Sequence, residues 1–139
     1  MIQLIIGENG KGKTKVLLDR ANTEIKTANG NIVYLDKSAQ HMYELNNKIR
    51  LIDVTSFPIT NSDEFIGFIC GIISQDHDLE QMYLDSFLKI AVLEGKDVTA
   101  ALDKLEKIGK EYNVNFVISI SLTKEQLPES MKESIIEEL

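Results

Sequence analysis

Hydrophobic and polar positions along the chain fall into two alternating patterns. Five short, nearly continuous apolar runs are typical of strands buried on both faces of a sheet, and they lie at residues 2–6, 32–35, 49–54, 82–85 and 115–122. Apolar residues three or four positions apart predict helices between them, over about 13–27, 62–74 and 97–112. A short helix is expected after Ser38, and Pro128 predicts a closing helix through Leu139.

This alternation of strands and helices predicts an α/β fold, with a mostly parallel sheet of about five strands and helices on both faces. The chain has 139 residues and shows no internal repeat, linker or low-complexity tract, so we expect a single domain, 1–139. Hydrophobic residues make up 43% and charged residues 27%, which is ordinary globular usage and excludes a disordered chain.

The charge balance and the hydropathy of the chain limit the classes of partner that it is expected to bind. Fifteen basic and 22 acidic residues give a net charge of −7, which argues against a general nucleic-acid binder. The longest apolar run, 65–73, is about half of what spans a bilayer, and no targeting segment is apparent, so we expect a cytoplasmic protein without a membrane partner.

One motif stands out, directly after the first apolar run. Two glycines five positions apart are followed by lysine and threonine, which is the pattern of a phosphate-binding loop. Glycines allow backbone N–H groups to surround a phosphate, and the helix that follows adds its positive end. The lysine would contact the phosphates, and the threonine hydroxyl would bind magnesium. The binding residues are expected to be Gly7, Glu8, Asn9, Gly10, Lys11, Gly12, Lys13 and Thr14.

This loop, GENGKGKT, resembles those of ATP-binding members of the P-loop nucleoside-triphosphatase superfamily. The resemblance implies a three-layer P-loop fold that binds ATP with magnesium. The chain has no Asn-Lys-x-Asp motif for guanine, which also favours ATP over GTP. Residues 123–128 further resemble the leucine–proline turn of translocase and pilus-retraction motors, but the chain lacks those motors' extra domain and their acidic and histidine boxes.

Members of the superfamily carry a second acidic residue at the end of a buried strand, which holds the magnesium through water. Asp36, Asp53 and Asp85 each lie at the end of an apolar run. The superfamily's metal-side strand normally follows a second strand–helix round. The resemblance therefore favours Asp85, with Asp53 and Asp36 as alternatives.

Hydrolysis of ATP requires a base that activates water, in addition to the residues that bind phosphate and magnesium. In the additional-strand ATPase division of the superfamily, a glutamate that activates water often follows the metal aspartate, but here that residue is Ser86. Glu8 and Glu94 are the alternatives for a base. Ser119 or Ser121, on the last strand, corresponds to the superfamily's γ-phosphate sensor, and we take Ser119 as the candidate. Lys13 is the expected source of charge stabilisation.

The sequence therefore predicts a magnesium–ATP-binding protein that is a weak or partner-activated ATPase. A protein partner or a second copy could supply the missing groups. One alternative is a small nucleoside or nucleotide kinase, because residues 34–43 resemble the post-strand region of thymidine kinases; the scarcity of arginines, Arg20 and Arg50 alone, argues against it. The other is a non-catalytic nucleotide switch, which Ser86 favours.

Several other residues that could carry chemistry are expected to have structural roles only. His41 and His77 have no partner at metal-ligand spacing and are expected at the surface. Cys70 is expected to be an inert thiol in the core, in a helix that is covered nearly all round. Gly67 and Gly71, four residues apart, are expected to let another element approach that helix closely.

Overall fold

Six parallel strands form a single sheet in the computed structural model, which describes residues 1–139. The strands are β1 (Ile2–Ile6), β2 (Asn31–Asp36), β3 (Arg50–Asp53), β4 (Leu79–Leu84), β5 (Asn115–Ile120) and β6 (Ile135–Glu138). Their order in the sheet is β3-β2-β4-β5-β1-β6. Strand β5 therefore lies between β1 and β4 and pairs with both in parallel.

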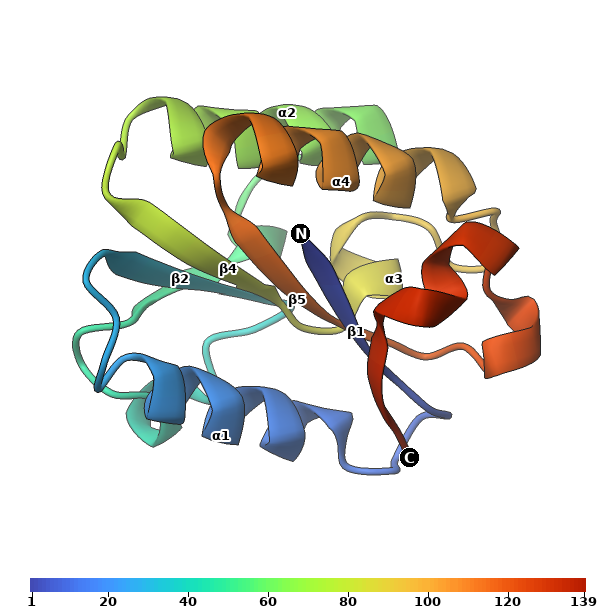
Figure 1. Ribbon diagram of the computed structural model, residues 1–139, viewed down its shortest axis with the longest axis horizontal. Coiled ribbons are helices and arrows are strands. Elements are labelled where there is room, and N and C mark those ends of the chain that lie inside the picture. Colours follow the sequence, from blue (N-terminus) through green and yellow to red (C-terminus); the bar gives the residue numbers. More distant parts are fainter.

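Helices lie on both faces of this sheet. They are α1 (Lys13–Glu24), α2 (Ser62–Ser74), the single-turn α3 (Phe87–Ile90) and α4 (Thr99–Tyr112). Figure 1 shows α2 and α4 over one face and α1 over the other. Two apolar cores result, because alternate side chains of one strand point to opposite faces. Leu4 and Ile6 of β1 join the larger core under α2 and α4, whereas Ile5 packs with Leu17 of α1. The predicted α/β class and parallel sheet are confirmed.

The predicted closing helix is wrong. After Pro128 the chain makes a 3₁₀ segment, η4 (Glu129–Ser134), and then strand β6. Strand β6 pairs in parallel with β1, and the Leu139 N–H donates to the Ile6 carbonyl at 2.9 Å. Without β6, β1 would form an edge with unpaired backbone groups, so pairing competes with helix formation here. The sheet consequently has six strands rather than about five.

Other boundaries move less. Helix α1 ends at Glu24 instead of about residue 27, and the helix expected after Ser38 is a single 3₁₀ turn, η1 (Met42–Glu44). Two further 3₁₀ turns, η2 (Val54–Ser56) and η3 (Lys124–Gln126), follow the ends of β3 and β5. No helix combines the length and apolar character needed to cross a membrane.

Helix α2 is covered on one face only. Phe65, Ile69 and Ile73 are buried against the sheet. Cys70 is exposed, so its assignment to the core is wrong. A Cβ atom placed on Gly67 or Gly71 would meet nothing within 4 Å, so no element approaches the helix there and that prediction is also wrong. Apolar composition alone did not reveal which side faces solvent.

Candidate functional site

A cavity of about 190 Å³ lies where the carboxyl ends of β1, β4 and β5 meet. None of the residues that line it is hydrophobic. They come from the glycine-rich loop after β1, the first turn of α1, and the ends of β2, β4 and β5. They are Asn9, Gly10, Gly12, Lys13, Thr14, Lys37, Asp85, Ser86, Ser119 and Ser121. We call this space the phosphate cavity, after the ligand that the sequence pattern of the loop predicts.

The loop between β1 and α1 depends on its glycines. Gly10 (φ 83°) and Gly12 (φ 94°) have backbone conformations that side chains rarely adopt. Gly12 is also the residue before α1, and no side chain caps the helix. The first N–H groups of α1 are therefore left for a ligand, and a helix N-terminus favours an anionic one.

Lys13 is the buried cation of the site. Lys13 is only 8% exposed, and its Nζ donates to the carbonyl oxygens of Gly7 at 2.8 Å and Glu8 at 2.9 Å. Burial lowers the pKa of the Lys13 ammonium, and the charge of Asp85 partly opposes this. No carboxylate lies within ion-pair distance of Nζ. A buried ammonium without a paired anion is suited to bind one.

Asp85 and Thr14, 71 residues apart in the chain, meet beside Lys13. The Thr14 hydroxyl donates to Asp85 Oδ1 at 3.3 Å. Asp85 is 1% exposed, and its carboxylate also accepts hydrogen bonds from the Tyr34 hydroxyl (2.7 Å), the Ser119 hydroxyl (2.6 Å) and the Ser86 N–H (2.9 Å). These bonds fix the carboxylate on the side of the sheet where α1 begins.

This pair has the chemistry of a magnesium site. Thr14 offers a hydroxyl oxygen and Asp85 a carboxylate oxygen, and no group of three or more His, Cys, Asp or Glu side chains lies close enough to form a full metal cage. Magnesium prefers few protein ligands, completed by water and phosphate oxygens. The donors present therefore fit Mg²⁺.

The other two aspartates, Asp53 and Asp36, do not line the phosphate cavity and make no hydrogen bond to the loop. Asp53 accepts from the Thr55 N–H at 3.0 Å and from its hydroxyl at 2.6 Å, so it caps η2. Asp36 is 2% exposed; Oδ1 accepts from the Lys37 N–H, while Oδ2 has no partner and is the one buried side-chain oxygen or nitrogen in the chain without a partner. Burial, and secondarily the charge of Asp85, raises the pKa of Asp36 to about 6.

The serines at the end of β5 differ in their surroundings. Ser119 is 1% exposed, and its hydroxyl donates to Asp85 while accepting from the Ser86 N–H at 2.9 Å. Ser121 is partly exposed and donates to Asn9 Oδ1 in the loop at 2.8 Å. Both line the phosphate cavity. Ser119 therefore positions Asp85, and Ser121 is the hydroxyl with more freedom to contact a ligand.

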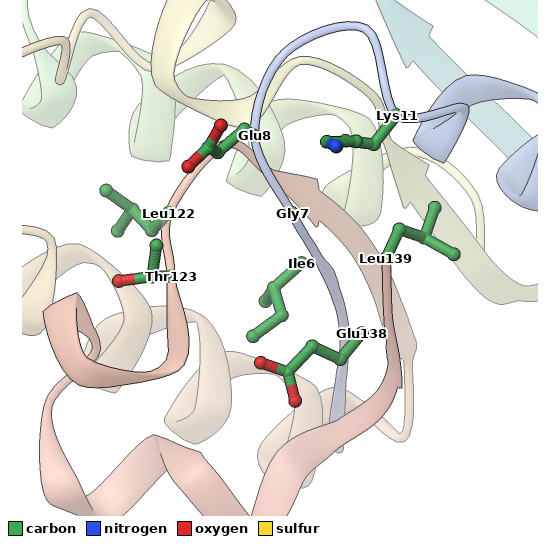
Figure 2. A pocket seen from close by; sticks show the side chains of 8 residues that line it. All are labelled: Ile6, Gly7, Glu8, Lys11, Leu122, Thr123, Glu138 and Leu139. Carbon is green, nitrogen blue, oxygen red and sulfur yellow. The ribbon is translucent and has the colours of Figure 1, made fainter.

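Neither glutamate considered as a base lines the phosphate cavity. Glu8 is exposed and borders a separate cavity of about 230 Å³, together with Lys11, the chain after β5 and the end of β6. Figure 2 shows Glu8 and Lys11 on the loop and Leu139 nearby. Glu94 is exposed as well. Gly7 also lines this separate cavity, and its carbonyl accepts from Lys13 Nζ. The five other loop residues line the phosphate cavity: Asn9, Gly10, Gly12, Lys13 and Thr14.

Two residues near the site were not singled out by the sequence. Tyr34 holds Asp85 from the neighbouring strand β2, and Lys37 lines the phosphate cavity. Finding them requires knowing that β2 lies beside β4, which the sequence does not reveal. His41 and His77 lie away from the cavity; His41 pairs with Glu44 and His77 is exposed.

In comparisons with known proteins, no protein-family model matches the chain, and no curated protein is detectably similar to it in sequence.

Proposed function

We propose that the chain is a P-loop protein that binds ATP with magnesium at residues 7–14 and hydrolyses it slowly unless a partner assists. The observation that carries the proposal is the contact between Thr14 and Asp85 beside the buried Lys13 ammonium. Residues with the right chemistry for phosphate and magnesium come together from two distant segments. The position of β5 between β1 and β4 supports membership of the additional-strand division.

Each residue has a definite place in this proposal. The loop N–H groups and the start of α1 bind the phosphates, and Lys13 exchanges its two carbonyl partners for phosphate oxygens. Thr14 and Asp85 would hold the magnesium, which supplies charge neutralisation when bound. Tyr34 and Ser119 keep Asp85 in place. Ser121 would contact the terminal phosphate.

Lys13→Ala tests the binding site. Mg–ATP is expected to raise the melting temperature of the natural protein by roughly 5–10 °C at a hundredfold excess over Kd, since a ligand specific for the folded state stabilises it by about 2.7 kcal/mol. Lys13→Ala should lose most of this shift in differential scanning fluorimetry. The control is Lys15→Ala, because Lys15 is exposed on the same helix and pairs only with Asp19. Equal shifts in all three proteins would show that the loop is not the binding site.

Asp85→Asn tests the magnesium site separately. The neutral amide should weaken Mg–ATP binding by about tenfold or more, while metal-free ATP binding changes little, because removing an anion from the site also relieves its repulsion of phosphate. Isothermal titration calorimetry with and without EDTA measures both affinities. Asp53→Asn, at a residue that caps η2, is the control. If Asp53→Asn or Asp36→Asn showed the magnesium-selective loss instead, the assignment of Asp85 would be wrong.

A further inference from the structure

A second cavity, of about 290 Å³, adjoins the phosphate cavity. The two share four lining residues, Asn9, Lys37, Ser86 and Ser121. A molecule in the second cavity would therefore lie against whatever occupies the first. Its volume is just below the range for pockets that bind drug-sized molecules, about 300–1,000 Å³, so it suits a smaller molecule.

The charges of this second cavity are unpaired. Lys37, after β2, and Lys89, in α3, both line it, and neither forms an ion pair or a side-chain hydrogen bond. Two ammonium groups without an ion pair line this cavity, although the chain has a net charge of −7; the charge of Lys37 interacts with the Asp36 carboxylate without forming an ion pair. Glu94 faces the same space, also without an ion-pair partner. Two cations suit an anionic group, and a carboxylate accepts hydrogen bonds from hydroxyls.

The backbone that presents these groups is strained. Ser86 (φ 56°) and Val92 (φ 57°) are left-handed without being glycine, and they flank α3. The conformation is least favourable for a β-branched residue such as Val92. The buried Phe87 and Ile90 anchor α3 in the core and leave the exposed Lys89 at the cavity. Strain of this kind persists where the surrounding structure maintains it, and it concentrates at ligand sites.

We propose that this second cavity binds a small phosphorylated hydroxyl compound, such as a sugar phosphate. Lys37 and Lys89 bind its anionic group, and Glu94 accepts from a hydroxyl. This inference rests on the proposed function in one respect: the ligand in the adjoining phosphate cavity is taken to be the terminal phosphate of ATP. Lys37 borders both cavities and would contact both ligands.

Inorganic phosphate is the first probe, followed residue by residue through amide chemical shifts. In Lys13→Ala, where the loop is disabled, saturable shifts should remain at residues 88, 89, 94 and 95, which line the second cavity but not the phosphate cavity. Lys89→Ala should weaken them by at least about fivefold, the effect of losing about 1 kcal/mol of binding. Lys107→Ala, an exposed lysine of α4 without an ion pair, is the control. Loss of all shifts in Lys13→Ala, or unchanged affinity in Lys89→Ala, would overturn the proposal.

Ribose 5-phosphate is the second probe, and it tests the hydroxyl part. It should bind Lys13→Ala more tightly than inorganic phosphate does, and Glu94→Gln should reduce that advantage. Equal affinities for the two probes would overturn the assignment of a hydroxyl compound. Because these titrations contain no ATP, their results do not depend on whether ATP binds. Conversely, the natural protein could fail to bind Mg–ATP while the second cavity still bound phosphate, which would reject the proposed function alone.

Discussion

Asp36→Asn is expected to make the protein more stable at neutral pH, by up to about 3 kcal/mol. The pKa of Asp36 is raised from its ordinary value of 3.8 to about 6 in the folded protein, primarily by burial. Each unit of difference between folded and unfolded pKa corresponds to about 1.4 kcal/mol. Because the side chain is only 2% exposed, solvent screens little of this penalty. The ionised form of Asp36 is therefore costly to bury in the folded protein.

Stability falls as the pH rises because the folded state binds the Asp36 proton more tightly than the unfolded state does. Below about pH 4, Asp36 is protonated in both states and carries no penalty. Between about pH 4 and pH 6 the unfolded chain loses the proton first, so stability falls as the pH rises. Above about pH 6 the carboxylate is ionised in both states, and the penalty is constant. Asparagine removes this dependence while its side-chain oxygen can keep the bond from the Lys37 N–H.

Urea unfolding at pH 4, 5, 6, 7 and 8 measures the effect. The difference in free energy of unfolding between Asp36→Asn and the natural protein should increase by about 2–3 kcal/mol from pH 4 to pH 8. Asp103→Asn, on the exposed side of α4, is the matched control. A difference that stays constant across this range would mean that Asp36 is ionised normally in the folded protein.

Much of the fold could be predicted because its signals are local. The buried strands of a parallel sheet are continuous apolar runs, and α4 has apolar residues at helical spacing, so both were found close to their observed bounds. Strand β6 was missed because its pairing partner, β1, is more than 100 residues away in sequence. A helix signal at Pro128 is local, whereas the unpaired edge of β1 that competes with it is not.

In the candidate site too, features set by local sequence could be predicted, and features set by contacts between distant segments could not. The loop 7–14 is contiguous in sequence, so its geometry follows from glycine, lysine and threonine at fixed spacing. The choice of Asp85 depends on the order of strands that the resemblance implies; in the structure Asp85 accepts a hydrogen bond from Thr14, 71 residues away in sequence. Ser119 and Ser121 are two residues apart, so strand alternation predicts the same face for both. Their surroundings differ because Ser119 lies within β5 and donates to Asp85, whereas Ser121 follows the end of β5 and donates to Asn9. The burial of Asp36 depends on the packing around it, which no local pattern encodes.

The purified chain is expected to hydrolyse ATP far more slowly than the median enzyme rate of about 10 per second. The phosphate cavity contains charge-stabilising groups, but no carboxylate that is free to orient water. Asp85 already accepts four hydrogen bonds, and the next residue is Ser86, whose hydroxyl is not a base near neutral pH. Glu8 and Glu94 are outside this cavity.

The shortage of arginine also predicts slow ATP hydrolysis. Arg20 lies in the second half of α1, and Arg50 begins β3 at the amino end of the sheet, so neither lines the phosphate cavity. A missing arginine can lower the rate of this chemistry by about 10³–10⁵. Steady-state phosphate release by the purified protein, compared with Lys13→Ala, measures the intrinsic rate. A partner that raises turnover would have to bring an arginine and a base to this cavity. Turnover near the median rate by the chain alone, abolished by Lys13→Ala, would contradict this expectation and return Glu8 and Glu94 as candidates for the base.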